Sequence, residues 1–288
     1  MTTAINHLQD PFGRVHSYLR IGVAEQCNLR CIYCMPEKGM HFAPEENLLS
    51  TGEILRVLRV GARLGLSKVR FTGGEPLVRR DIEELLDSAT KIDGIRSVHL
   101  TTNGLLLGKH LPAFKRSGLT GLNISLDTLN AARFLRITRR NGLEKVIESI
   151  HKAIEIGIPK IKLNVVALKD FNTDELVRFV EFTRDHPVTV RFIELMPFNS
   201  QENKWREAAY TSAIYVQELL KAAYPELSTE RGTATEQHSF SLPGYKGTFA
   251  IIPAYTRSLC EACTRLRVTA DGKLMNCLYS TEPYNLRD

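Results

Sequence analysis

No stretch of the 288-residue chain reaches the ~18–20 consecutive apolar residues that a transmembrane helix requires. Residues 1–20 are polar and lack the apolar core of a secretory signal, so we expect a cytoplasmic protein with no membrane partner. Hydrophobic residues make up 43% of the chain and charged residues 24%, which excludes wholesale disorder. The net charge of +6 suits an anionic partner. Because the densest basic spots are only the pairs Arg79-Arg80 and Arg139-Arg140, we expect a solvated basic face and no nucleic-acid partner.

The long middle of the chain contains no cysteine, and six cysteines lie in two groups of three near the two ends. A chain of this length can bury an ample core and shows no export signal, so we expect no disulfide framework. Clustered thiols in such a protein indicate metal or redox chemistry. The groups are Cys27, Cys31 and Cys34, and Cys260, Cys263 and Cys277.

Six short β-rich runs alternate with amphipathic helical runs over the first two thirds of the chain. This rhythm predicts an α/β fold with a parallel sheet, either open or curled into a barrel. Ser50 with Glu53 matches a capping box, and Asn172 with Glu175 resembles one. We expect strands at 19–23, 68–72, 98–102, 122–126, 160–167 and 188–195, and helices at 54–64, 82–92, 144–156 and 174–185.

After residue 196 the alternation stops. A helix is expected at 213–223, followed by short hairpin-like strands at 247–252, 265–269 and 273–278. We therefore predict two domains, residues 1–196 and a smaller α+β region at 197–288 that carries the second cysteine group.

Polar or conformationally special residues follow almost every predicted strand. Any one of these segments could simply form a loop, but catalytic groups of parallel α/β folds gather where strands end, so together they indicate one shared site. The segments are Cys27, Gly73-Gly74-Glu75-Pro76, Thr102-Asn103-Gly104, Ser125 with Asp127, and Met196-Pro197.

Three cations, Arg70, Lys162 and Arg191, lie in the middle of predicted strands. Strands of a parallel sheet are usually apolar, and an unpaired buried cation costs several kcal/mol. Each cation therefore needs either a buried carboxylate, such as Glu194 for Arg191, or an anionic ligand. Since three strands contribute cations, we favour a polyanionic ligand.

Three thiolates can hold three irons of a [4Fe–4S] cube and leave the fourth iron open to another ligand. A structural zinc site is the alternative, and it requires four ligands. No histidine lies at the usual spacing from either cysteine group, and the nearest one, His41, is expected in a surface loop.

The stretch Cys27-Asn28-Leu29-Arg30-Cys31-Ile32-Tyr33-Cys34 resembles the cluster loop of radical S-adenosylmethionine (SAM) enzymes. Further stretches narrow the resemblance to the GTP 3′,8-cyclase family, and it extends from about residue 10 to the end of the chain. It implies an incomplete parallel (β/α)6 barrel of the TIM type, with the C-terminal region covering its opening. The stretches are residues 10–14, 72–77, 101–104, 123–127, 191–194 and 260–272.

The resemblance implies SAM and two [4Fe–4S] clusters as cofactors. The first cysteine group would hold the cluster that binds SAM, and the second group would hold a cluster whose open iron binds the guanine of GTP. The positions that match the SAM pocket are Tyr33, Gly74, Ser125 and Met196. The positions that match GTP contacts are Arg20, Arg70, Thr101, Lys162, Arg265, Leu266 and Arg267.

The implied reaction converts GTP to (8S)-3′,8-cyclo-7,8-dihydro-GTP in the first step of molybdenum cofactor biosynthesis. It implies a low-potential electron donor and a downstream cyclic pyranopterin monophosphate synthase as partners, and it is compatible with a homodimer. The alternatives are a two-cluster radical SAM enzyme with another substrate, a truncated non-catalytic Fe–S or nucleotide-binding paralogue, and a zinc-binding structural protein.

Two departures from the family are visible in the sequence. The loop before the first cysteine reads Gly22-Val23-Ala24-Glu25-Gln26, where the family usually has a serine, a threonine and an acidic–arginine pair. The sequence stops at Asp288, eleven residues after Cys277, whereas family members continue to a double glycine. We therefore expect both clusters to bind but leave completion of the cyclisation open.

Overall fold

The computed structural model describes residues 7–36, 38–196, 209–230, 238–256, 263–278 and 282–287. The described strands are β1 (Tyr18–Gly22), β2 (Lys68–Thr72), β3 (Ser97–Thr102), β4 (Gly121–Ser125), β5 (Ile161–Ala167), β6 (Thr189–Glu194), β7 (Ser228–Glu230), β8 (His238–Ser241), β9 (Thr248–Ile252), β10 (Arg265–Val268), β11 (Lys273–Met275) and β12 (Tyr284–Asn285). The helices are α1 (Thr51–Arg63), α2 (Ile82–Thr90), α3 (Leu107–Arg116), α4 (Ala131–Thr138), α5 (Leu143–Glu155), α6 (Leu176–Asp185) and α8 (Ala213–Ala223), with short 3-10 turns η1 (Glu45–Asn47), η2 (Pro76–Val78) and η3 (Thr173–Glu175).

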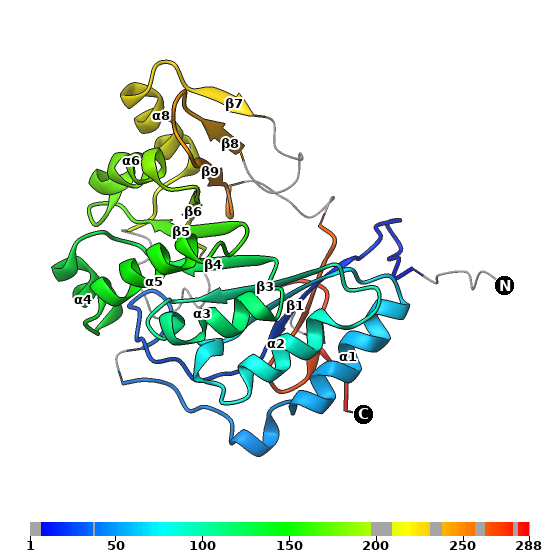
Figure 1. Ribbon diagram of the computed structural model, residues 1–288. Helices are drawn as coiled ribbons and strands as arrows, with labels where there is room; N and C mark the ends of the chain where they lie inside the picture. Colours follow the sequence, from blue (N-terminus) through cyan, green and yellow to red (C-terminus); the bar gives the residue numbers. More distant parts are fainter. Residues whose placement is uncertain are drawn as a thin grey trace.

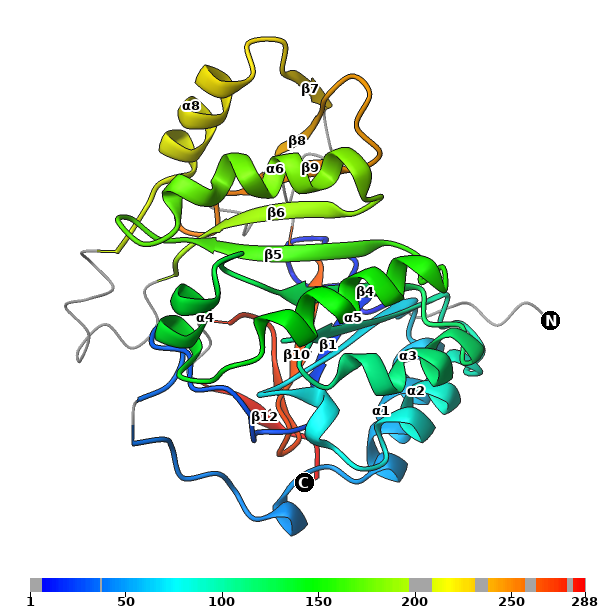
Figure 2. The ribbon, with the colours of Figure 1, turned by 60° about the vertical axis from the view of Figure 1, so that its left-hand side comes forward.

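The described strands form one open sheet in the order β12-β11-β10-β1-β2-β3-β4-β5-β6-β9-β8-β7. The central strands, from β10 to β9, run parallel, and the outer strands on both sides pair antiparallel. Figures 1 and 2 show the helices α1 to α6 along one face of the strongly curved sheet. The expected parallel sheet is therefore present.

Every predicted strand and helix is present, with ends that differ by no more than three residues. Helices α3 and α4 were not predicted. Pro112 lies inside α3, and α4 is a short helix that ends at Arg139 in the left-handed conformation, with φ of 56°. A proline and a short length both weaken the helical pattern on which a prediction depends.

Of the two predicted capping boxes, only the first forms. The Ser50 hydroxyl accepts from the Glu53 amide at 3.3 Å, and the Glu53 carboxylate accepts from the Ser50 amide at 2.7 Å. The second prediction is wrong, because the Asn172 side chain donates to the carbonyls of Asp127 and Val166 instead of capping a helix. Glu175 is buried and accepts from Thr128 and from a loop amide, so this pair links the loops that follow β4 and β5.

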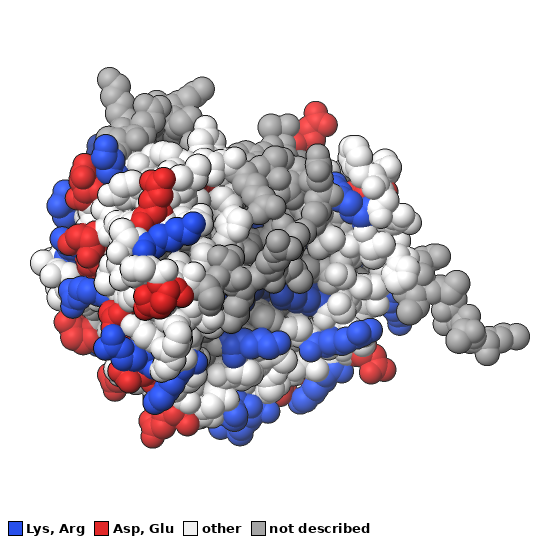
Figure 3. Space-filling view, turned by 90° about the horizontal axis from the view of Figure 1, so that it is seen from above, with Lys and Arg blue, Asp and Glu red and all other residues white. Residues whose placement is uncertain are grey.

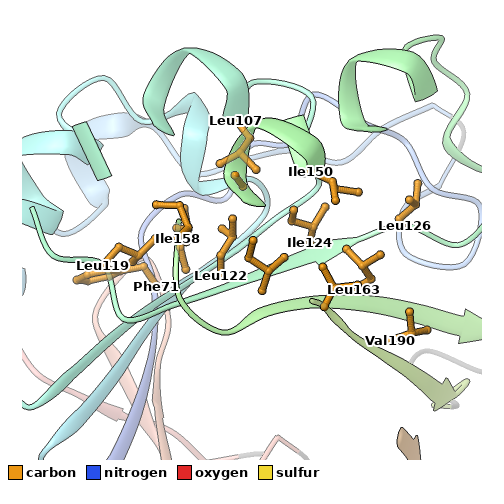
Figure 4. Packing of buried hydrophobic residues seen from close by; sticks show 14 of the residues in the cluster. Phe71, Leu107, Leu119, Leu122, Ile124, Leu126, Ile150, Ile158, Leu163 and Val190 are labelled. Atoms are coloured by element: carbon orange, nitrogen blue, oxygen red, sulfur yellow. The ribbon is translucent and has the colours of Figure 1, made fainter. Parts of the chain in front are cut away.

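Alternate residues of the central strands face the helices and form the main hydrophobic core. In Figure 4, Leu122 and Ile124 of β4 and Leu163 of β5 pack beneath Leu107 and Ile150 of the helices. All five side chains are fully buried. The other face of the same strands carries the polar and cationic residues of the candidate site.

The strands of the C-terminal region join the sheet at both of its sides. β10 pairs parallel with β1, and β9 pairs parallel with β6. Figures 1 and 2 show blue β1 and orange β10 side by side, although they come from opposite ends of the chain. The sequence did not predict this pairing. The predicted domain boundary at residue 196 stays a prediction, since the described segment ends there.

Charges of both signs cover the surface. Over the left-hand part of the face in Figure 3, lysine and arginine side chains are interspersed with aspartate and glutamate. No helix of the described segments is long and apolar enough to span a membrane.

We expect Ile124→Ala to lower the free energy of unfolding by about 2–5 kcal/mol, because it leaves a cavity in the fully buried core between β4 and its covering helices. The matched control is Ile214→Ala in α8, where the side chain is 64% exposed, and its effect should stay within about 0.5 kcal/mol. Urea unfolding measures both values. Equal losses for the two variants would contradict this account of the core.

Candidate functional site

The first cysteine group lies on the loop that follows β1. Cys27 and Cys31 are partly buried and Cys34 is exposed. The amides of Cys34 and Met35 both donate to the carbonyl of Cys31 at 2.9 Å, which folds this part of the loop into a helical turn. The Cys27 sulfur accepts from the Leu29 amide at 3.4 Å. Burial raises the pKa of the Cys31 thiol, and nearby Asp127, Cys34 and Cys27 raise it further, so the three thiols share one small region.

The cysteine loop is held against the end of α4. The Arg30 amide donates to the Thr138 carbonyl and the Ile32 amide donates to the Ile137 carbonyl, both at 2.9 Å. The Arg139 guanidinium donates to the carbonyl of Arg30 at 3.0 Å. The backbone of this loop is therefore positioned by hydrogen bonds to α4 and to the residue that follows it.

Gly74 allows the loops after β1 and β2 to approach each other. Its amide donates to the Ala24 carbonyl at 2.8 Å, and a β-carbon added at Gly74 would lie only 2.3 Å from the carbonyl oxygens of Glu25 and Gln26. Only glycine fits this approach without moving backbone. The sequence analysis singled out this glycine as part of a ligand pocket and did not detect its contact with the cysteine loop.

The buried carboxylate of Glu75 links the ends of β2 and β3. It accepts from the Leu77 amide at 3.0 Å, and from the Thr102 hydroxyl and the Asn103 amide at 2.7 Å. Burial raises its pKa despite these three donors. The Asn103 side chain then donates to the Asn28 side chain at 2.7 Å, beside Cys27. The ends of β2 and β3 are thus connected to the cysteine loop.

Tyr33 is connected to the ends of β4 and β5 through Asp127. Its hydroxyl donates to one Asp127 oxygen at 2.7 Å, and the Val166 amide donates to the other at 2.8 Å. Burial raises the pKa of Asp127 to about 6, even though both donors lower it. Of the other residues predicted for the SAM pocket, Ser125 ends β4 and Met196 follows β6, and both are half-buried.

Three arginines stand side by side on the polar face of the sheet. Arg20 of β1 is in register with Arg70 of β2 on one side and with Arg267 of β10 on the other. Adjacent strands lie only ~4.8 Å apart, and like charges directly opposite each other destabilise a sheet. The Tyr18 ring offsets part of this repulsion, since the guanidinium carbons of Arg20 and Arg70 lie 5.4 Å and 5.6 Å from its centre. We call Arg70, Arg20 and Arg267 the arginine row.

A second row of polar residues follows across the sheet, with Thr101, Asn123 and Lys162 in register on β3, β4 and β5. Asn123 donates to the Thr101 hydroxyl at 3.2 Å. In the other orientation of the Asn123 amide, its oxygen faces Arg70 and accepts from that guanidinium at 2.5 Å. The predicted GTP contacts Arg20, Arg70, Thr101 and Lys162 therefore share one face of the sheet.

Arg191 lies on the same face, where its guanidinium donates to the Asn164 oxygen at 2.9 Å and 2.5 Å. Glu194, the carboxylate suggested as its partner, lies three positions along the strand and so faces the other side. There it accepts from the amides of Ala213 at 2.6 Å and Tyr255 at 2.8 Å. Glu194 therefore joins β6 to the C-terminal region.

In the second cysteine group, Cys263 accepts a hydrogen bond from Arg265 at 3.3 Å. Burial alone would raise the pKa of this thiol, but Arg265 and Arg267 lower it overall. Burial, with neighbouring Arg20 and Arg265, lowers the pKa of Arg267 to about 10, although the thiols of Cys263 and Cys277 oppose this shift. Arg267, at one end of the arginine row, thus lies close to these two thiols. Cys260 lies outside the described residues.

Leu266 is the one predicted substrate residue whose side chain is on the wrong face for a contact. It packs against the hydrophobic core, opposite to its neighbours Arg265 and Arg267. A ligand on the polar face therefore does not contact this side chain.

The chemistry of the first cysteine group suits a [4Fe–4S] cluster, because three thiols that share one small region can each hold a different iron of the cube. The amide that reaches the Cys27 sulfur also suits a cluster, because hydrogen bonds to sulfur tune its potential.

His99 is a residue of the polar face that the sequence analysis missed. It is in register with Arg70, bonds the Ser97 hydroxyl at 2.7 Å, and covers Gly121, where a β-carbon would lie 2.3 Å from its ring. Burial, with Arg70, Lys68 and Lys162, lowers its pKa to about 3. Its position two residues before Thr101 was the available signal, since such residues share a strand face.

We expect His99 to make stability fall with acidification. Its pKa in the folded chain is about 3, below the ordinary value of 6.5, so below pH 6.5 the unfolded chain binds a proton that the folded chain does not. Between pH 6.5 and pH 5 this should cost about 2 kcal/mol of unfolding free energy. Urea unfolding at pH 7 and pH 5 measures the loss, and His99→Asn should lose less. An equal loss in the unsubstituted protein and in His99→Asn would contradict the role given to His99.

Gly74→Ala should displace the cysteine loop, because the added methyl group collides with backbone carbonyls that cannot rotate away. We expect a loss of at least half of the iron and sulfide retained after anaerobic reconstitution. Gly118→Ala is the control, since a β-carbon there meets nothing within 4 Å, although its φ of 76° adds local strain. Full iron retention in Gly74→Ala would show that the loop tolerates the displacement.

Comparisons with known proteins agree with this geometry. The Radical SAM superfamily profile matches residues 21–183, and the Molybdenum Cofactor Synthesis C profile matches residues 188–288. The chain resembles the solved structure of Streptococcus suis SuiB bound to S-adenosylmethionine with a TM-score of 0.66 and 17% identity, covering 94% of this chain and 63% of that one. This likeness shows the fold, and the expected incomplete parallel barrel is confirmed.

Sequence relatives are closer. The chain is 44% identical over 283 residues to GTP 3′,8-cyclase of Listeria monocytogenes, covering 97% of this chain and 84% of the relative. It is also 44% identical over 283 residues to Molybdenum cofactor biosynthesis protein 1 of Homo sapiens, covering 98% of this chain. The chain spans 44% of that relative's length. A radical SAM family member carries a [4Fe–4S] cluster and SAM, and the chain belongs to the GTP 3′,8-cyclase family of radical SAM proteins.

Proposed function

We propose that the chain converts GTP to (8S)-3′,8-cyclo-7,8-dihydro-GTP, the first step of molybdenum cofactor biosynthesis. The observation that carries the proposal is the arginine row, which places three positive charges side by side on the polar face of the sheet. A polyanion relieves their mutual repulsion, and the triphosphate of GTP is such a polyanion. The names of the bacterial relatives support this substrate.

In this proposal each cysteine group holds one [4Fe–4S] cluster. The first cluster is held by Cys27, Cys31 and Cys34, and the second by Cys260, Cys263 and Cys277. Residues Tyr33, Gly74, Ser125 and Met196 line the SAM pocket. When bound, the cluster and SAM supply the one-electron chemistry that opens the C3′–H bond of the nucleotide.

The protein binds and orients the nucleotide. Guanidinium groups of the arginine row form paired hydrogen bonds with phosphate oxygens, each worth roughly 1.5–3 kcal/mol. Thr101 and Lys162 extend the same face toward β5. Arg265 donates to Cys263, so the second cysteine group adjoins β10, the strand that carries Arg267 of the arginine row. In this proposal the guanine and the triphosphate therefore bind at neighbouring positions.

The proposed reaction consumes two electrons from a low-potential donor, one for the cleavage of SAM and one, with a proton, for the final reduction of the cyclised nucleotide. It delivers its product to a cyclic pyranopterin monophosphate synthase. A cytoplasmic location and a homodimer are compatible with the proposal.

Arg70→Ala should weaken GTP binding about tenfold or more, because it removes a charged contact of roughly 1.5–3 kcal/mol. Cleavage of SAM without GTP should change much less. Isothermal titration of the anaerobically reconstituted protein measures GTP affinity, and Lys109→Ala on the surface of α3 is the control. Unchanged affinity in Arg70→Ala would remove the basis of the proposal.

The activity itself is tested with reconstituted protein, dithionite, SAM and GTP under anaerobic conditions. We expect both 5′-deoxyadenosine and the cyclised nucleotide, and neither product from Cys27→Ala, whose far-UV circular dichroism should remain that of the unsubstituted protein. Retained SAM cleavage in Cys27→Ala would refute the cluster assignment. Cleavage of SAM without a cyclised nucleotide would refute the proposed product.

A further inference from the structure

The cysteine loop borders a basic hollow in the surface that the proposed function does not use. The hollow has a volume of about 690 Å³ and lies between the cysteine loop, the segment after it and the end of α4. We call it the basic depression. Its lining residues are Arg30, Lys38, Gly39, Met40, Leu135, Arg139 and Arg140.

The arginines of the basic depression contact backbone carbonyls. Arg30 donates to the carbonyls of Cys27 and Leu29, and Arg140 donates to the carbonyl of Arg139. Within the segments that the structure describes, none of Arg30, Lys38, Arg139 and Arg140 forms an ion pair. Carbonyl contacts do not cancel a net charge, so the depression keeps a positive field that attracts anionic partners.

Two exposed apolar side chains lie among these cations. Met40 is 54% exposed and Leu135 is 44% exposed. Apolar side chains surrounded by charges are typical of protein interfaces, and small interfaces of this kind serve weak electron-transfer complexes. Charge complementarity therefore points to an acidic protein as the occupant.

The position of the depression indicates what such a protein delivers. Arg30 lies between Cys27 and Cys31 in the sequence, and the neighbouring Cys34 is exposed. Arg30 also donates to the Cys27 carbonyl, so the cluster that these thiols hold in the proposed function would lie beside the depression. The reaction also requires an electron that no residue of the chain can supply.

We propose that the basic depression docks a small acidic one-electron carrier protein that reduces the first cluster. The inference rests on the proposed function, which supplies the need for the electron. One electron leaves the carrier, which is oxidised by one unit, and the first cluster is reduced by one unit. No atom is transferred.

The test uses Lys38→Glu combined with Arg140→Glu in the anaerobically reconstituted protein, with flavodoxin as the acidic carrier. Both side chains are exposed, and neither hydrogen-bonds the cysteine loop. At low ionic strength we expect flavodoxin to bind about tenfold more weakly by isothermal titration, and flavodoxin-driven SAM cleavage to fall to a similar extent. At high salt the variant and the unsubstituted protein should bind flavodoxin equally, because exposed charges are screened. Iron content and dithionite-driven cleavage should not change.

A second hollow provides a matched control. It has a volume of about 360 Å³, is lined by Lys109, Lys145 and Lys152, and lies along α3 and α5 with no contribution from the cysteine loop. Lys145→Glu with Lys152→Glu makes the same change of charge there. We expect this control to bind flavodoxin and to be reduced by it as the unsubstituted protein is.

Three results would overturn the inference. They are unchanged flavodoxin binding in the first variant, an equal loss in the control, and an equal loss of the dithionite-driven and flavodoxin-driven rates. A loss of RNA binding with flavodoxin binding intact would assign the depression to a nucleic acid instead. If the unsubstituted protein cleaves no SAM with dithionite, the proposed function fails, while the flavodoxin titration still tests the docking surface.

Discussion

The parallel pairing of β1 with β10 is the contact on which the candidate site depends. It puts Arg267 in register with Arg20, and it brings Cys263 and Cys277 next to β1 near the Tyr18 end of that strand, while the first cysteine loop follows the other end. The pairing thus brings together in space two cysteine groups that lie near opposite ends of the sequence. The site is therefore a product of the tertiary fold, assembled from sequence segments that share no local structure.

The two faces of the same strands perform different tasks. One face carries Phe71, Leu122 and Leu163 and stabilises the fold through burial. The other carries the arginine row, which opposes folding by repulsion and which an anionic ligand would neutralise. Because a ligand that binds only the folded state stabilises it, substrate binding and stability are coupled in this protein.

Much of the fold was predictable because a two-residue period marks each strand and turn residues mark each strand end. The cysteines could be singled out because they are grouped in the sequence. Arg70 and Lys162 could be singled out because they lie in the middle of predicted strands. The network around Glu75 was not, because two of its donors are backbone amides, which carry no sequence signal. The partner of β1 was not predictable either, since register between distant strands is decided by packing. The wrong prediction of a cap at Asn172 has a similar cause, because the same pair of residues can either cap a helix or link two loops.

The outermost described strands of the sheet are among its shortest. β12 spans two residues and β7 spans three, and both pair antiparallel with their neighbours. An exposed sheet edge offers free amides and carbonyls on which another chain can add a strand, and short edge strands are one way proteins prevent this. Within the described residues, the sheet therefore ends in edges that offer few free amides and carbonyls to an aggregating chain.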